Sequence, residues 1–405
     1  MKAVVWHGIG DIRLDDVPEP QLKDSTDAIV RLTASAICGT DLHFIRGTMS
    51  GMVPGTILGH EGVGVVEKVG DDVRNFAPGD RVVIPSTISC GYCPPCRAGN
   101  TAQCDNANPN GSSAGTAFYG GPKESGPFDG LQAEKARIAY ANSSLIKLPD
   151  NVSDDQAILL SDIFPTAYFG ADIAGVKEGS VAVVFGCGPV GQFAIISARL
   201  LGATRIIAVD RLPDRLEMAR RNGAEIVNFD KEDPTEAIKR LTGGVGADCV
   251  IDVVGIDAQH AHDGPAKPDK QKAQKFTEQV QQNAPDAKPT KDGQWVPGDG
   301  PSQVLEWAVE VVKKAGQIGI IGVYAPSMTT YPIGKAMNKN LTIRMGNCDH
   351  RAYIPRLVNL VASGVIDPSK VLTEQEDIQD AISAYKAFDK RQPGWIKVEL
   401  EPQTA

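Results

Sequence analysis

The sequence predicts an α/β protein that combines a doubly wound parallel sheet with a β-rich domain. Short apolar or alternating runs separated by turn residues occupy residues 1–155. From residue 181 to 345, apolar runs alternate with helix-like segments, a pattern typical of a parallel sheet covered by helices on both faces. Residues 349–405 fit two helices and a final strand, which we expect to return to the first domain.

Composition supports two folded domains and excludes some partners. The chain has 405 residues, enough for two substantial cores. Its 41 basic and 50 acidic residues give a net charge of −9, which repels a phosphate backbone, so we expect no nucleic-acid partner. The N-terminus lacks the apolar core of a signal peptide, and we expect a cytoplasmic protein. The apolar window at 181–201 contains glycines, a proline and Arg199, which favours a buried strand and helix over a membrane span.

The β-rich character of the first domain follows from its short runs and turn signals. The runs at 28–32, 62–69 and 81–84 are apolar or alternating, and Pro-Gly-Asp at 78–80 precedes the third. A helical period is nearly absent here. We therefore expect a compact β domain with long functional loops.

The first chemical cluster includes Cys38 and His60. A thiolate and an imidazole are suitable zinc ligands, and ligands from separate segments that leave one position open form a catalytic site. The alternative interpretation is a buried cysteine and a histidine satisfied by hydrogen bonds. Acidic neighbours favour the metal site, because Asp41 is suited to orient the far nitrogen of His60 and Glu61 to lie just outside the metal.

A second cluster contains four cysteines within 15 residues. They follow the pattern C-x2-C-x2-C-x7-C, at Cys90, Cys93, Cys96 and Cys104. Four thiolates so close together can complete a tetrahedral shell, which predicts a structural zinc. A redox or disulfide cluster is the alternative, and the acidic chain argues against a nucleic-acid zinc ribbon.

A third zinc ligand is expected near the start of the helical region. Ser153 and Gln156 fit a capping box that opens an apolar helix at 157–160. Asp162 follows among apolar neighbours, where a carboxylate is costly unless it is paired or bound to a metal. The alternative is that Ser161 or Asp162 simply caps the helix that resumes beyond.

A glycine pattern marks the parallel sheet. The apolar run that begins at residue 181 breaks into Gly-x-Gly-x-x-Gly, followed by a helix-like segment and a second apolar strand. This order is typical of a Rossmann unit, in which backbone N–H groups and the helix N-terminus face a pyrophosphate, although a plain tight turn is the alternative. The residues expected at the cofactor are Gly186, Gly188, Pro189, Val190 and Gly191.

The acidic residue after the second strand indicates which dinucleotide binds. Asp210 lies about 20 residues beyond the glycine turn, where a carboxylate can accept both ribose hydroxyls of NAD. Its charge also repels a 2′-phosphate, which favours NAD over NADP. The neighbouring Arg211 keeps NADP open.

A long polar segment interrupts the alternation at 257–300. It is rich in Lys, Gln, Asp, Pro and Ala, which favours a solvated excursion with a short helix at 273–281. Because the segment follows a strand end, a lid over the cofactor is a second hypothesis. His260 and His262 are too isolated to be predicted as ligands, and we expect surface residues.

In their order, these features resemble the zinc-dependent medium-chain alcohol dehydrogenases over nearly the whole chain. The likeness is greatest to the glutathione-independent formaldehyde dehydrogenases and dismutases, through Cys-Gly-Thr-Asp-x-His at 38–43, the cysteine lobe at 90–104, Leu-Ser-Asp with the following Pro-Thr, and the insertion. The resemblance implies a GroES-like catalytic domain at 1–155 and 346–405, with an NAD-binding Rossmann domain at 156–345. It also implies a homodimer or homotetramer.

The resemblance assigns roles to five polar residues. Cys38, His60 and Asp162 would bind a catalytic zinc, which makes two zinc ions per chain together with the lobe. Thr40 and His43 would pass the substrate proton to solvent by way of the cofactor ribose. A zinc-bound alcohol or aldehyde hydrate then loses its proton and transfers hydride to NAD.

One departure bears on the substrate. The formaldehyde enzymes place a bulky aromatic residue four positions before the first lobe cysteine, where this chain has Ser86. A smaller side chain enlarges the pocket, which favours an alcohol or aldehyde larger than formaldehyde.

Two alternatives to an exchanging dehydrogenase stay open. The first is a cofactor-retaining dismutase or nicotinoprotein, with residues 257–300 covering NAD. The second is a dinucleotide-binding structural protein without activity. The metal and relay residues argue against the second, since a structural protein has no need of an open metal site.

Overall fold

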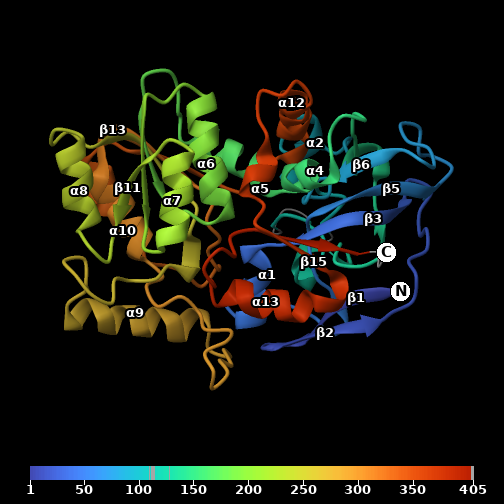
Figure 1. The fold of residues 1–405 in the computed structure, drawn as a ribbon, viewed down its shortest axis with the longest axis horizontal. Helices are drawn as coiled ribbons and strands as arrows, with labels where there is room; N and C mark the ends of the chain where they lie inside the picture. Colours follow the sequence, from blue (N-terminus) through green and yellow to red (C-terminus); the bar gives the residue numbers. More distant parts are fainter. Residues whose placement is uncertain (109, 111–114, 127, 403–405) are drawn as a thin grey trace.

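The computed structural model describes residues 1–108, 110, 115–126 and 128–402. The chain forms two parts that lie side by side, one built on a parallel sheet and the other rich in antiparallel strands (Figure 1). Within the described residues, no helix is long and apolar enough to cross a lipid bilayer.

The first part is a six-stranded sheet in which all neighbouring strands run parallel. In sheet order the strands are β11 (Glu225–Asn228), β10 (Arg205–Asp210), β9 (Val181–Phe185), β12 (Ala247–Asp252), β13 (Val312–Ile320) and β14 (Thr342–Met345). The helices around it are α5 (Ile163–Ile173), α6 (Pro189–Leu200), α7 (Pro213–Arg221), α8 (Pro234–Leu241), α10 (Gln303–Val311) and α11 (Ile333–Asn338).

The central strand β9 is buried on both faces. Ala182 and Val184 belong to the core that includes α5 and α6, whereas Val183 and Phe185 belong to the core that includes α8 and α10. The Phe185 ring stacks on that of Trp307 in α10, with centroids 6.0 Å apart. A strand covered on both faces needs a continuous apolar run, and this confirms the predicted doubly wound α/β fold.

The second part holds a larger sheet that is antiparallel apart from a parallel pair of strands at one edge. Its main path is β15 (Glu374–Asp377), β16 (Val398–Glu401), β3 (Ala28–Ile37), β5 (Gly62–Val69), β6 (Arg81–Ile84) and β8 (Ile146–Lys147), while β7 (Lys135–Ile138) also pairs with β3. A small sheet contains β2 (Asp11–Asp16), β1 (Lys2–Gly8) and β4 (Thr56–Ile57). The C-terminal β16 lies antiparallel to β3, with Leu400 opposite Ser35, so a strand from near the C-terminus completes a sheet that begins at residue 28.

Two consecutive helices connect the two parts. The helix α4 (Asp154–Ser161) packs against β3, β5 and β6, whereas α5 packs against α6 and β13. The predicted capping box at the start of α4 is confirmed, since Ser153 Oγ accepts from the Gln156 amide at 3.3 Å and Gln156 Oε1 accepts from the Ser153 amide at 3.2 Å. Asp162 is the junction residue, with φ −140° and ψ −66°.

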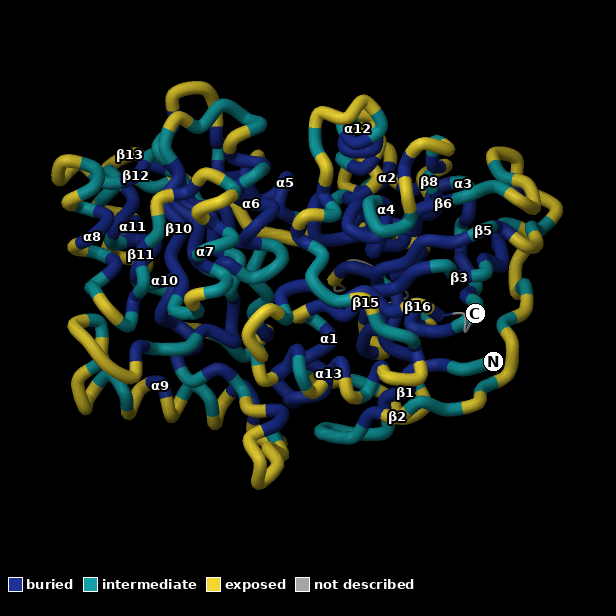
Figure 2. The backbone as a smooth tube through the Cα atoms, viewed as in Figure 1, coloured by how far each residue is buried: buried dark blue, intermediate teal, exposed yellow. Residues whose placement is uncertain are grey.

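The insertion forms a longer helix than the sequence indicated. Helix α9 spans Lys270–Asn283, whereas the expected range was 273–281. Figure 2 shows exposed residues along α9, which lies at one edge of the molecule. Phe276 is buried, and Gln279 Nε2 donates to Ser302 Oγ at 3.0 Å, so part of this polar segment is packed against the body.

Candidate functional site

A single cleft brings the predicted metal ligands and the glycine turn together. Its volume is about 1050 Å³, and both parts of the molecule contribute to its walls. Cys38, His60 and Asp162 line it together with the turn at 186–191. A metal-bound group and a dinucleotide could therefore meet inside it.

Three separate segments deliver the first donor set. Cys38 precedes helix α1 (Gly39–Arg46), His60 follows β4, and Asp162 joins α4 to α5. His60 Nε2 lies 3.3 Å from Asp162 Oδ2, and Cys38 Sγ lies 3.8 Å from the same oxygen. All three side chains are buried, and a donor atom of each lies within 4.8 Å of the others and of a Glu61 oxygen.

The donor set fits zinc. Sulfur, imidazole nitrogen and carboxylate oxygen are its usual ligands. Burial raises the pKa of the Cys38 thiol, although the adjacent His60 opposes this effect. Burial also raises the pKa of Asp162, but hydrogen bonds from His350 and His60 outweigh it and hold that pKa well below its usual range. A cation among these buried donors would stabilise their anionic forms.

Two acidic neighbours of this set occupy different positions. Asp41 Oδ1 lies 3.4 Å from His60 Nδ1, while its other oxygen accepts from the Cys38 amide at 2.9 Å. Glu61 is fully buried and pairs with Lys397, whose Nζ lies 2.5 Å from Oε2. Among the described residues, Glu61 Oε1 has no hydrogen-bond partner. Glu61 therefore has one oxygen held by Lys397 and a second one free.

The Asp162 side chain does not cap helix α5. It makes no capping hydrogen bond, so the capping alternative is wrong for this residue. Its Oδ1 instead accepts from Thr166 Oγ1 at 2.9 Å and lies 2.8 Å from His350 Nε2. Ser161 Oγ donates to the Ile84 carbonyl and accepts from the Gly62 amide, which ties the junction to the antiparallel sheet.

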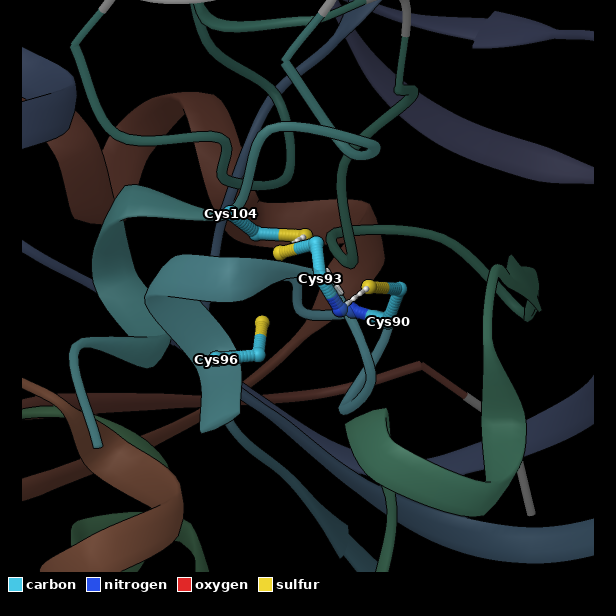
Figure 3. A group of neighbouring side chains, drawn as sticks. All are labelled: Cys90, Cys93, Cys96 and Cys104. Atoms are coloured by element: carbon cyan, nitrogen blue, oxygen red, sulfur yellow. Dashed lines mark hydrogen bonds between the residues drawn. The ribbon is translucent and has the colours of Figure 1, made fainter. Parts of the chain in front are cut away.

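The four lobe cysteines lie around a common centre. Cys96 belongs to the short helix α2 (Pro94–Arg97), and all four sulfurs lie within 4.8 Å of one another (Figure 3). The Cys93 amide donates to Cys90 Sγ at 3.3 Å, and the Cys90 amide donates to Cys104 Sγ at 3.2 Å. Such N–H···S contacts stabilise negative charge on sulfur, the form that binds metal. All eight cysteines are free thiols.

The glycine turn brings the backbone close to the cleft. Gly186 has φ +93°, which favours glycine. A Cβ on Gly191 would lie 2.0 Å from the Gly186 carbonyl oxygen, so a side chain is excluded there. Helix α6 begins at Pro189 and Val190, and Gly188 is its N-cap. The N–H groups of its first turn are available to an anion.

Asp210 ends β10 beside this turn. Its Oδ2 accepts from the Cys187 amide at 2.7 Å, and its Oδ1 accepts from the Arg211 and Leu212 amides at 2.6 and 3.0 Å. The carboxylate is therefore held rigidly at the mouth of the turn. The Arg211 guanidinium forms an ion pair with Asp230 at 3.0 Å, which offsets its charge.

Thr40 and His43 lie on helix α1 and line the same cleft. His43 is buried, and its Nδ1 lies 2.9 Å from Thr48 Oγ1 and 3.2 Å from Asp257 Oδ2. Asp257 also accepts from Arg46 Nη1 at 2.6 Å. Since the carboxylate accepts, Nδ1 of His43 carries the proton and Nε2 is left to exchange one.

Comparison with known proteins decides the family. A model of the alcohol dehydrogenase GroES-like domain matches residues 24–150, and a model of zinc-binding dehydrogenases matches residues 189–262. The uncharacterized zinc-type alcohol dehydrogenase-like protein AdhB of Bacillus subtilis (strain 168) is 37% identical over 406 residues, covering 99% of this chain and 100% of that protein. The chain belongs to the zinc-type alcohol dehydrogenases. It is thus an oxidoreductase, and the structural-protein alternative is wrong.

Two further likenesses bear on this dehydrogenase. The glutathione-independent formaldehyde dehydrogenase of Pseudomonas aeruginosa (strain LESB58) is 34% identical over 85% of this chain and 80% of its own length. The solved alcohol dehydrogenase TADH from Thermus sp. ATN1 has a TM-score of 0.80 and 32% identity, with 99% of both chains covered. The family resemblance and the GroES-like and Rossmann architecture are thereby confirmed.

Ser86 is joined in the dehydrogenase cleft by an aromatic residue that the sequence analysis missed. Ser86 is buried and lines the cleft. Phe118, from a different loop, also lines it, and its ring meets the His60 ring edge-on with centroids 6.1 Å apart. The space beside the donor set therefore depends on both residues.

Three charged or polar partners of the site were also missed. His350, at the start of helix α12 (His350–Ala362), contacts Asp162 from 188 residues away, and its Nδ1 lies 3.1 Å from Thr87 Oγ1. Lys397 reaches Glu61 across 336 residues, and Asp257 reaches Arg46 across 211. No local motif marks them, so only the tertiary fold could reveal them.

Proposed function

We propose that this dehydrogenase oxidises an alcohol or an aldehyde hydrate and transfers hydride to NAD. Cys38, His60 and Asp162 would hold the catalytic zinc, which, when bound, lowers the pKa of the substrate hydroxyl. The lobe cysteines would hold a second, structural zinc. The observation that carries the proposal is the shared cleft, in which the donor set and the glycine turn lie together.

Several contacts support NAD as the cofactor. The turn N–H groups and the α6 N-terminus suit the pyrophosphate, and Asp210 suits the ribose hydroxyls. Arg215 and Arg391 line the same cleft. Burial, with the guanidinium groups of Arg46 and Arg215, lowers the pKa of Arg391 to about 10, so a bound anion would stabilise these charges. The pairing of Arg211 with Asp230 supports NAD over NADP.

The residues of helix α1 support a proton path. Thr40 would accept the substrate proton at Oγ1, and His43 would receive it at Nε2 through the cofactor ribose. Asp257 stabilises the resulting imidazolium, because its carboxylate faces Nδ1 at 3.2 Å. Glu61 and Lys397 would position the His60 segment from behind and take no proton from substrate.

The substrate pocket favours an alcohol or aldehyde larger than formaldehyde, since Ser86 leaves room that an aromatic residue would fill. Phe118 limits that room from the other side. Primary alcohols of increasing chain length are assayed with NAD and then with NADP. We expect the highest kcat/KM for an alcohol with more than one carbon, and a higher kcat/KM with NAD than with NADP. A preference for formaldehyde hydrate would overturn the substrate assignment.

A second candidate function is dismutation on a retained cofactor. Gln282, Asn283 and Asp286 of the insertion line the cleft, which supports a cover over the dinucleotide. Retained NAD would be reduced by one aldehyde hydrate and reoxidised by the next aldehyde.

The family likeness further supports a cytoplasmic homodimer or homotetramer, and mass photometry would measure the oligomeric state. It also supports domains divided at 155/156 and 345/346, which limited proteolysis would test.

One experiment separates the candidates. The purified enzyme is denatured, and the released zinc and dinucleotide are quantified in the same sample. About two zinc ions with no NAD per chain support an exchanging dehydrogenase. About two zinc ions with one NAD support the retained cofactor. If the enzyme is refolded without zinc and is still active, the proposal is wrong.

A further inference from the structure

A second group of metal-type ligands lies outside the catalytic cleft. His260, His262 and Asp299 each offer one donor atom, and these atoms lie within 4.8 Å of one another. The expectation that the two histidines are isolated was wrong, because Asp299 returns to them from the far end of the insertion. His262 is half exposed and His260 is less so, which leaves the cluster open to ions in solvent.

The His260 ring is oriented as a ligand would be. Its Nδ1 lies 2.9 Å from the Ala261 carbonyl oxygen. A carbonyl oxygen only accepts, so Nδ1 carries the proton and the Nε2 lone pair of the neutral ring points to the cluster. Metal-bound histidines commonly donate their other ring nitrogen in this way. Phe276 stacks on the ring at 5.8 Å with planes 12° apart, which fixes its plane.

The two oxygens of the Asp299 carboxylate make different contacts. Its Oδ1 accepts from the His260 amide at 2.9 Å, which positions the side chain. Its Oδ2 accepts from His262 Nε2 at 2.7 Å, a proton that a bound metal ion would displace, and lies 3.6 Å from His260 Nε2. The 3.6 Å separation is too long for a hydrogen bond. A lone pair of His260 therefore faces a carboxylate oxygen, an arrangement that a cation between them would stabilise.

We propose that His260, His262 and Asp299 form a third metal site for Zn²⁺ or a similar divalent transition metal. Two imidazoles and one carboxylate suit zinc, and donor atoms bound to one tetrahedral ion lie about 3.3 Å apart. The distances of 2.7 and 3.6 Å bracket this value. The half-exposed setting leaves the fourth position to water.

The site would act as a clasp at the base of the insertion. Its ligands lie near both ends of the segment 257–300, which already meet through hydrogen bonds from backbone amides. The Gly300 amide donates to the Ala258 carbonyl at 2.9 Å, and the Gly298 amide donates to Asp257 Oδ1 at 3.0 Å. A bound ion would hold these ends together and restrain Asp257, which faces His43.

Zinc binding tests the proposal on the whole enzyme. The holoenzyme, with its tightly held zinc retained, is dialysed and titrated with Zn²⁺ alone by calorimetry. We expect one further ion per chain, and His262→Gln should weaken this step at least about tenfold. His7→Gln is the matched control, because His7 pairs with Asp15 at 2.7 Å as one imidazole with one carboxylate.

Hydrogen exchange gives an independent measurement. Added Zn²⁺ should slow amide exchange at 258–262 and 298–300 in the parent enzyme and in His7→Gln, but not in His262→Gln. Circular dichroism establishes that the variants are folded. Equal zinc affinity in His262→Gln and the parent, or binding without slowed exchange at these residues, would overturn the clasp.

Discussion

The cysteine lobe and the catalytic donor set are two clusters of metal-type ligands built in opposite ways. The lobe takes all four sulfurs from residues 90–104, and their backbone amides donate to neighbouring sulfurs. The donor set takes Cys38, His60 and Asp162 from three segments and depends on more distant partners. A local cluster needs little beyond its own loop, whereas a dispersed cluster needs the whole fold.

The largest expected effect falls on the dispersed cluster. Asp162→Ala removes one of three donors, so we expect the catalytic zinc to be lost and kcat/KM to fall by at least about 10³-fold. Zinc content should drop by one ion per chain while the lobe keeps its own. Asp172→Ala is the control, because this exposed carboxylate lies on α5, the helix that follows Asp162, and accepts from Tyr353 Oη. Full zinc content in Asp162→Ala would contradict the ligand assignment.

Loss of a lobe ligand should act on stability instead. Cys96→Ser weakens a shell whose metal contributes folding energy, so we expect the Tm to fall by about 5 °C or more. Differential scanning calorimetry measures the change, with the exposed neighbour Arg97→Ala as the control. The activity of the molecules that remain folded should change much less than in the Asp162 variant. A variant that melts like the parent would show that the lobe holds no structural metal.

His350 tests whether the dispersed cluster relies on its distant partners. His350→Ala removes the contact to Asp162 Oδ1, and we expect about 10- to 100-fold weaker catalytic zinc binding. Competition with a chromophoric chelator measures that affinity. His350→Gln retains a donor and should recover part of the loss. If the parent and both variants bound the catalytic zinc equally well, His350 would have no role in zinc binding and would serve only in packing.

The smallest effect concerns a buried carboxylate near the site. Glu399 lies on β16 two residues beyond Lys397, and burial raises its pKa to about 8. A raised carboxyl pKa means that stability is greatest below the unfolded value of 4.5 and falls as the pH rises toward 8.

Glu399→Gln should therefore increase the free energy of unfolding at pH 9 by about 2 kcal/mol and change little at pH 4. Urea unfolding at the two pH values measures the difference. Glu61→Gln provides the contrast, because Glu61 has Lys397 as its cation and its replacement should destabilise the protein. If Glu399→Gln raised the free energy of unfolding equally at both pH values, ionisation of the Glu399 carboxyl group would not be the cause.

The parts of the molecule that the sequence predicted are those with local signals. The capping box at Ser153, the strand-turn-helix around Gly186 and the strand periods are each visible within a few residues. Asp162 was found because a carboxylate among apolar neighbours is unusual. Its alternative as a helix cap was decided only by the structure.

The rest could not be predicted because its contacts join distant positions. His350 and Lys397 lie 188 and 336 residues from the groups they contact. Asp299 likewise lies 37 residues from His262, with a helix between them. One sequence carries no information on which distant polar residues meet, since many arrangements satisfy the same local pattern. The aromatic wall at Phe118 was missed for the same reason.

The position of Asp162 gives the molecule a mechanical property. Helix α4 is attached to the antiparallel sheet and α5 to the parallel sheet, and Asp162 is the residue between them. Cys38 and His60 belong entirely to the antiparallel side. A metal bound by all three residues would therefore link the two halves. Any rotation of one half against the other would then distort the coordination of that metal. Loading the metal should therefore make the two halves unfold more cooperatively.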